Sequence, residues 1–188
     1  TNFVGREQEV ALLLSRWHEA VGGEGQGVLL CAEAGIGKST IAYRLCDRLA
    51  DENPQRMQFQ GSPYHTNTAL YPAINVLREA AGLTSQDGPT AQLDKLDVLA
   101  SESGIDKQEA VSLFADLLSI PGNHRYPPLT MSSETRKDMT LEALVQRLHR
   151  LADRSPVLFI VEDAHWLDPT TLDLLTRIIN RIRQMRVL

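Results

Sequence analysis

One stretch limits what this chain can fold into more than any other, the segment 32–40 with the sequence Ala-Glu-Ala-Gly-Ile-Gly-Lys-Ser-Thr. An apolar run, 27–31, leads into it, and a run with helical spacing, 41–46, follows it. The order of strand, glycine-rich turn, Gly-Lys-Ser and helix is typical of a backbone loop that wraps a phosphate group. The alternative is a chance glycine-rich turn before a helix, and the flanking runs favour the phosphate loop.

Each residue type in this loop has a predicted task. Gly35 and Gly37 let the backbone curl so that successive N–H groups point inward, a geometry that β-carbons obstruct. Lys38 supplies a positive charge for the β- and γ-phosphate oxygens, and Ser39 supplies a hydroxyl for Mg²⁺. Ala32 departs from the strict pattern, which begins with glycine, but a looser form of the motif allows alanine. The loop residues predicted to hold a nucleotide are Ala34, Gly35, Ile36, Gly37, Lys38, Ser39 and Thr40.

A second motif ends in two acids. Residues 157–161 are all apolar, as expected of a strand covered on both faces, and Glu162 and Asp163 follow directly. In a parallel sheet this strand end lies at the same edge as the phosphate loop. One carboxylate is then expected to hold Mg²⁺ with Ser39, and the other to orient or deprotonate the attacking water.

The usual order of this motif is Asp then Glu, and here it is reversed. By position Glu162 matches the metal ligand and Asp163 the catalytic acid, although the sequence leaves this assignment open. The predicted catalytic residues are therefore Lys38, Glu162 and Asp163, and hydrolysis is expected to be slow because aspartate reaches less far toward water. The alternative is a strand end with two solvated acids.

Length and composition fit one α/β domain over 1–188, with a helical insertion at 83–132. The net charge of −5 argues against a nucleic-acid-binding surface, which needs concentrated Lys and Arg. Cys31 and Cys46 are expected to be buried free thiols. The sequence has no signal-peptide pattern and no apolar run of about 18 residues, so we expect a cytoplasmic protein without a membrane segment.

The spacing of apolar residues and turn residues predicts the remaining elements. Predicted helices cover 7–21, 38–50, 71–81, a segment around 93–99, 109–120, 134–154 and a final helix after Asp168, its expected cap. Predicted strands cover 27–32, 57–61, 157–161 and the opening of another at 186–188. The apolar residues of the final helix are Leu172, Leu175, Ile178, Ile179 and Ile182.

Several residues near these motifs have two possible roles. His165 is expected near the γ-phosphate, where it could sense charge, but packing beside Trp166 is an equal alternative. Trp166 itself is expected to pack, with an adenine contact as the alternative. His65 could face the phosphates and Arg125 could act on a neighbour's nucleotide, although surface or packing roles are favoured for both.

The whole chain resembles a known family. Val4-Gly5-Arg6-Glu7, then Gly-Ile-Gly-Lys-Ser, then Glu-Asp-Ala-His-Trp-Leu-Asp-Pro at 162–169 is similar to the signal-transducing group of P-loop ATPases within the AAA+-like superfamily. Further stretches are similar to the ATPase region of bacterial multidomain class III adenylate/guanylate cyclases. These stretches are Ser62–Asn67, Leu117–Pro121, Arg125–Pro128 and Lys137–Leu144.

The resemblance implies a three-layer P-loop sandwich with a parallel sheet, in which the strand near Arg186 lies between the strands ending at Ala32 and Glu162. It implies that Val4 and Arg6 line the adenine and ribose side of a bound ATP or ADP, with Mg²⁺ as the metal. It also implies that the sheet is truncated after Leu188, with a polar sensor residue beyond it.

The same resemblance implies a function. The chain is expected to be an ATP-binding regulatory switch that hydrolyses ATP slowly, with an effector domain such as a cyclase in the same polypeptide. Association with a second copy is left open. One alternative is a nucleotide-binding interaction module without hydrolysis. The other is the ATPase domain of a DNA-associated or transcription regulator, against which the acidic balance weighs.

Overall fold

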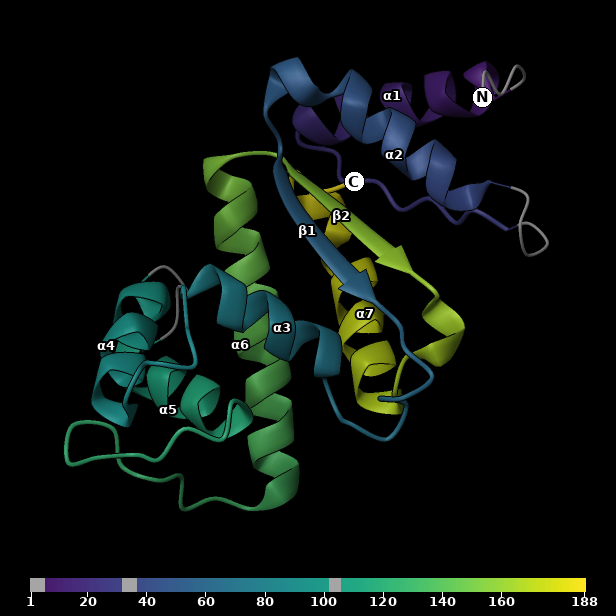
Figure 1. The fold of residues 1–188 in the computed structure, drawn as a ribbon. Coiled ribbons are helices and arrows are strands. Elements are labelled where there is room, and N and C mark those ends of the chain that lie inside the picture. The colour runs from purple at the N-terminus through teal and green to yellow at the C-terminus, as the bar shows by residue number, and fades with distance from the viewer. Residues whose placement is uncertain (1–5, 32–36, 102–105) are drawn as a thin grey trace.

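The computed structural model describes residues 6–31, 37–101 and 106–188 (Figure 1). The helices are α1 (Glu7–Val21), α2 (Lys38–Arg48), α3 (Tyr71–Ala80), α4 (Pro89–Ala100), α5 (Lys107–Leu117), α6 (Ser133–Arg154) and α7 (Pro169–Arg181). The strands are β1 (Gln55–Gln60) and β2 (Val157–Glu162), and 3-10 turns lie at Ala50–Glu52, Ala164–Trp166 and Ile182–Gln184. Among the described helices, none is both long enough and apolar enough to cross a membrane.

The two strands form a parallel pair. Their register runs from Gln55 opposite Val157 to Gln60 opposite Glu162, so both strands end at the same edge. On the other side of β2, Val187 forms a single parallel bridge with Val157. The carbonyl of Val187 accepts a hydrogen bond from the N–H of Gln26 (2.9 Å). Val187 therefore lies between β2 and the segment that leads to the phosphate loop, the position that the resemblance predicted.

The predicted strand at 27–32 is wrong over the residues that the structure describes. Residues 27–31 have no regular secondary structure, and the Leu29 side chain is 84% exposed. A strand forms only where a neighbouring backbone offers a ladder of hydrogen bonds. Among the described residues, the bond from the Gln26 N–H to the Val187 carbonyl is not continued into a ladder of backbone hydrogen bonds along 27–31. Cys31 is exposed rather than buried for the same reason, and Cys46 is half-buried.

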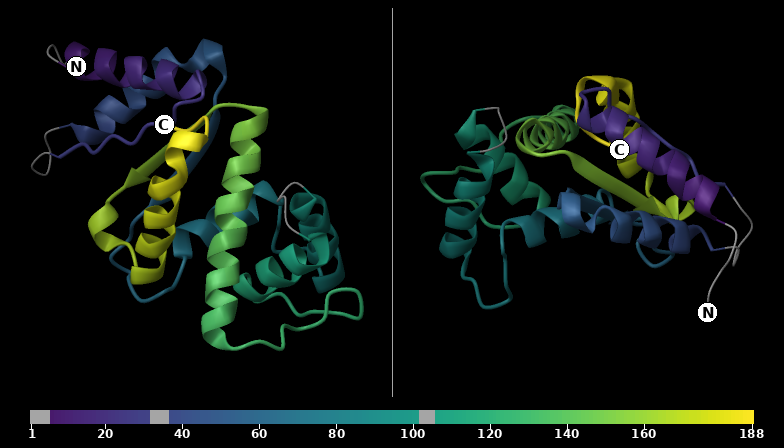
Figure 2. Two further views of the ribbon diagram at one scale, coloured as in Figure 1. Left: turned by 180° about the vertical axis from the view of Figure 1, so that it is seen from behind. Right: turned by 90° about the horizontal axis from the view of Figure 1, so that it is seen from above.

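Helices cover both faces of the strand pair. Phe59 and Phe159, which meet edge to face at 4.8 Å, belong to the core shared with α3, α6 and α7. Leu158 and Ile160 point to the opposite face and pack with residues of α1 and α2, including the fully buried Trp17. This alternation is the strand period of two, and it gives each face its own apolar core. Figure 2, seen from behind, shows α6 and α7 side by side across the strands.

The buried face of α7 contains only some of the apolar residues of this helix. Leu174 and Ile178 are buried, together with Thr171. Leu172 and Ile179, which the sequence pattern also assigned to the apolar set, are 46% and 62% exposed. Positions 171, 174 and 178 follow the helical spacing of one face, and α7 can turn only one face to the core.

The predicted insertion at 83–132 contains α4 and α5. The two helices pack against each other, and α5 also packs against α6. Figure 1 shows them on the side of α6 away from the strands. Their core includes Leu96, Phe114 and Tyr126 and is distinct from the two cores of the sheet. Whether this segment is an insertion in the evolutionary sense stays a prediction.

Candidate functional site

The phosphate loop is described from Gly37 onward. Gly37 is the residue before α2 and has φ 82°, a left-handed conformation that glycine adopts at no steric cost. Lys38, Ser39 and Thr40 form the first turn of α2, where backbone N–H groups lack partners within the helix. Lys38 is half-buried, while Ser39 and Thr40 are exposed. The predicted nucleotide-binding residues Val4, Ala34, Gly35 and Ile36 lie outside the described residues.

The two acids stand at the carboxyl end of β2. Glu162 is the last residue of the strand and is half-buried, whereas Asp163 is exposed and has φ 51°. Positive φ is uncommon for an aspartate and turns the backbone sharply at this point. Asp163 therefore does not continue the strand, although it is adjacent to Glu162 in sequence.

Each acid is held by a glutamine of the neighbouring strand. The side-chain amide of Gln58 donates to Oε2 of Glu162 (2.7 Å), and that of Gln60 donates to Oδ2 of Asp163 (2.8 Å). The sequence pattern did not identify either glutamine as part of the site. The signal was present in the sequence, because residues two apart in a strand share a face and both lie near its carboxyl end.

A cleft of about 530 Å³ connects the two motifs. Ser39 from α2 and Glu162 from β2 both line it, and Gln58 lies in the same wall. The hydroxyl and the carboxylate that the sequence predicted as ligands of one metal ion therefore line the same cleft. Of the two acids, Glu162 is the one that lines this cleft.

This donor set fits Mg²⁺. Among the described residues, no group of three or more His, Cys, Asp and Glu side chains could hold a metal ion. Magnesium bound beside a nucleotide needs no such group, because one or two protein oxygens are completed by phosphate oxygens and water. A serine hydroxyl and a glutamate carboxylate on one cleft meet this requirement.

The loops that follow the two strands are joined to each other. The N–H of Gly61 donates to the carbonyl of Glu162 (2.9 Å). A β-carbon at Gly61 would lie 2.1 Å from the carbonyl oxygen of Asp163, so only glycine allows this approach. The sequence pattern did not predict this role for Gly61, because the residues that crowd it lie far along the chain.

Asp168 has the predicted capping role and a further one. Its Oδ1 accepts hydrogen bonds from the N–H groups of Thr170 (2.9 Å) and Thr171 (3.0 Å) at the start of α7. Its Oδ2 accepts from the hydroxyl of Thr171 and from the N–H of Leu70 (3.2 Å), the residue before α3. The cap is confirmed, and the bond to Leu70 is one that the local sequence did not indicate.

The histidines and Arg6 are engaged in local contacts. The His65 ring stacks on Tyr71 with centroids 3.7 Å apart, and the centroids of His165 and Trp166 lie 4.9 Å apart. The stacking on Tyr71 supports the packing alternative for His65. His165 and Trp166 are both exposed, so the expectation that Trp166 packs in the interior is wrong. Arg6 lies directly before α1 and pairs with Glu9 (2.8 Å).

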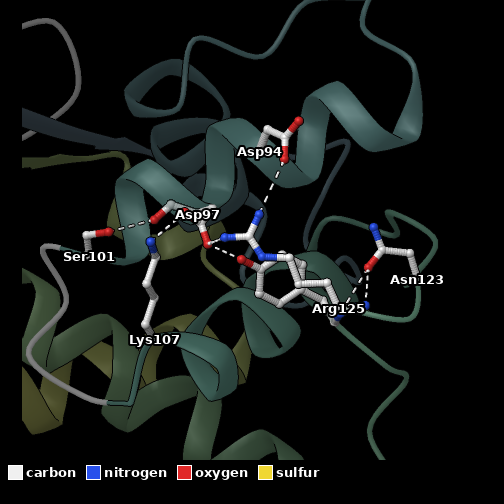
Figure 3. A network of polar contacts seen from close by, with 7 residues as sticks. Asp94, Asp97, Ser101, Lys107, Asn123 and Arg125 are labelled. Atoms are coloured by element: carbon white, nitrogen blue, oxygen red, sulfur yellow. Dashed lines mark hydrogen bonds and ion pairs between the residues drawn. The ribbon is translucent and has the colours of Figure 1, made fainter.

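Arg125 belongs to a polar network inside the predicted insertion (Figure 3). Its guanidinium donates to Asp97 (2.9 Å), which also accepts from Lys107 (2.5 Å) and from the hydroxyl of Tyr126. The Lys107 ammonium, and then the Tyr126 hydroxyl, hold the pKa of Asp97 below its usual range. Burial, followed by the bond to Asp97, raises the pKa of Tyr126. These contacts support a structural role for Arg125.

Comparison with known proteins gives two matches. A sequence model of a protein family described as "AAA ATPase domain" matches residues 2–188. An uncharacterized protein of Rhizobium meliloti (strain 1021) is 32% identical over 176 residues, which cover 92% of this chain. The chain spans only 16% of that relative's length. No solved structure matches the chain.

Proposed function

This chain belongs to the family of AAA ATPase domains, and on that premise we propose that it binds ATP or ADP with Mg²⁺ as a slow, regulatory ATPase. Membership implies a P-loop α/β fold and nucleotide binding. The observation that carries the proposal is the shared cleft, which is lined by Ser39 in the first turn of α2, just after the left-handed Gly37, and by Glu162 at the end of β2. We propose that the fold is the three-layer sandwich expected from the sequence, with a parallel sheet as its middle layer.

The residues divide the chemistry between them. The amides of the phosphate loop and Lys38 hold the β- and γ-phosphates, and charge that develops on the γ-phosphate is stabilised there. Ser39 and Glu162 would hold Mg²⁺, which when bound would neutralise phosphate charge. Asp163 orients a water for in-line attack, with Gln60 fixing the carboxylate. Val4, which lies outside the described residues, and Arg6 would contact the adenine and ribose, as the sequence resemblance implies.

The proposed role is that of a switch. We call the end of the strand pair that carries Glu162 and Asp163 the acidic edge. The segments after β1 and β2 meet there, so a γ-phosphate would contact a surface made by two distant parts of the chain. The output would pass to an effector domain in the same polypeptide. A nucleotide cyclase is the effector that the sequence resemblance favours.

A substitution in the phosphate loop tests nucleotide binding. Lys38→Ala should weaken the affinity for ATP about tenfold or more, because a charge-assisted contact to phosphate is lost. Titration calorimetry with ATP and Mg²⁺ would measure it, with Arg44→Ala further along α2 as the matched control. Unchanged affinity in Lys38→Ala would contradict the loop assignment.

Hydrolysis is tested separately at the acids. Glu162→Gln and Asp163→Asn should leave ATP affinity largely intact but lower single-turnover hydrolysis by a factor of about 100 or more, because the charge at the reacting centre is lost. The alternative function, a nucleotide-binding module without hydrolysis, is favoured by one observation. Both acids are already engaged by glutamine amides. Binding of ATP by the unsubstituted chain without phosphate release above an uncatalysed control would establish that alternative.

A further inference from the structure

The buried carboxylate of Asp168 connects the two loops at the acidic edge. We define the first loop as residues 61–70, between β1 and α3, and the second loop as residues 163–168, between β2 and α7. Asp168 is 3% exposed, and its two oxygens accept four hydrogen bonds. Three come from the start of α7, and the fourth comes from Leu70 at the end of the first loop.

Leu70 is an unusual residue to find at this position. Its φ is 58°, its ψ is 25°, and its side chain is 4% exposed. A left-handed conformation costs a leucine free energy and persists only where surrounding contacts hold it. The bond from the Leu70 N–H to Asp168 is one such contact, and it holds the residue from which α3 begins.

The two loops are thus in direct contact with each other at both ends. At the strand ends the N–H of Gly61 bonds to Glu162, and the missing side chain of Gly61 admits the Asp163 carbonyl. At the helix starts Asp168 bonds to Leu70. A displacement of the second loop is therefore transmitted to the first.

We infer that Asp168 is a positioning residue that couples the acids at the end of β2 to α3. The further link is from α3 to α5, because Arg78 of α3 donates to the carbonyl of Leu118 just after α5 (3.3 Å). A change at the nucleotide reaches the α4–α5 pair by this route. The nucleotide-dependent part rests on the proposed function, whereas the coupling of the two loops does not.

The substitution Asp168→Asn separates the cap from the coupling. The asparagine side chain has one acceptor oxygen, which can keep the two N–H groups of Thr170 and Thr171, so α7 stays capped. Its NH₂ group would then face the N–H of Leu70, donor against donor. The NH₂ group can instead donate to the Thr171 hydroxyl, which also acts as an acceptor. The substitution therefore removes the bond between the loops and keeps the two backbone bonds at the start of α7.

The experiment is amide hydrogen exchange followed residue by residue by NMR, first without nucleotide. In Asp168→Asn the amides of Leu70 and the first loop should exchange roughly tenfold faster or more, while Thr170 and Thr171 keep their protection. The control is Asp106→Asn, the same chemical change at the cap of α5, where Oδ1 accepts from the Glu109 N–H (3.0 Å). Faster exchange confined to 168–172, or none in the first loop, would overturn the inference.

The second arm adds a non-hydrolysable ATP analogue with Mg²⁺. In the unsubstituted chain, exchange in the two loops should change together, and in Asp168→Asn only that of 163–168 should change. Both loops still responding together in the variant would overturn the inference. If the analogue does not bind, the proposed function fails, and the nucleotide-free arm still decides the coupling. If Asp168→Asn does not fold, Asp168→Ser, which can cap α7 but is too short to reach Leu70, replaces it.

Discussion

Single residues at the acidic edge owe their importance to neighbours that are distant in sequence. Gln58 reaches Glu162 and Gln60 reaches Asp163, in both cases across more than one hundred positions. Gly61 is the simplest example, because its role is to have no side chain. The Asp163 carbonyl occupies the space where a β-carbon would be, and Trp166 lies next to it.

Replacing this glycine should damage both stability and the site. Gly61→Ala is expected to lower the free energy of unfolding by about 1–3 kcal/mol, because the clash with the Asp163 carbonyl must push the loops apart. Urea denaturation followed by circular dichroism would measure this. The control is Gly88→Ala, where a β-carbon would meet nothing within 4 Å. Equal, small effects at both glycines would contradict the close approach at Gly61.

At the scale of elements, what matters is which face each helix turns inward. The α7 helix carries apolar residues on more than one face, and it packs with Leu174 and Ile178 against the strands and α6. Leu172 and Ile179 remain largely exposed. Ion pairs between α6 and α7, such as Arg181 with Glu142 (2.7 Å), agree with this orientation, because they hold the same side of α7 toward α6.

Two neighbouring leucines test the orientation of α7. Leu174→Ala should lower the free energy of unfolding by about 2–5 kcal/mol, because it leaves a cavity in the core. Leu172→Ala should change it by no more than about 0.5 kcal/mol, because that side chain is largely exposed. Chemical denaturation of both variants gives the comparison. A larger cost for Leu172→Ala than for Leu174→Ala would mean that α7 is rotated.

At the scale of the whole molecule, the pKa of carboxylates in several elements is lowered by contacts with basic side chains. Contacts with basic side chains lower the pKa of carboxylates in α1, in and before α4, in α6 and in α7. These carboxylates are Glu9, Asp87, Asp97, Glu142 and Asp173. A carboxylate whose pKa is lower in the folded state than in the unfolded state stabilises the protein at pH values above the unfolded-state pKa. This contribution is lost as the pH falls through the folded-state pKa.

The midpoint of thermal unfolding should therefore vary little from about pH 7 to about pH 6. It should decline below about pH 5, as the pH approaches the pKa of about 4 that these carboxylates have in the unfolded state. Asp97→Asn should lower the midpoint at pH 7 and flatten the decline. Its neighbour Asp94, whose pair with Arg125 is longer (3.8 Å) and more exposed, provides the control Asp94→Asn. A steeper decline in Asp97→Asn than in the unsubstituted chain would show that its pKa is not lowered by folding.

The sequence by itself determined the local features of this protein. Helical spacing predicted α1, α3 and α6 within a few residues, and the Asp168 cap followed from one side chain and its next neighbours. The two motifs of the candidate site could also be recognised in the sequence, because each is a short run of residue types with a defined task. In each of these cases the interactions that matter lie within a few positions along the chain.

Only the tertiary structure decided the features that depend on distant partners. The segment 27–31 has strand-like composition but no strand, because a ladder must come from elsewhere in the molecule. The orientation of α7, the glutamine contacts to the acids and the bond from Leu70 to Asp168 likewise join residues far apart in sequence. Such contacts are set by how the elements pack, and neither periodicity nor motif carries that information.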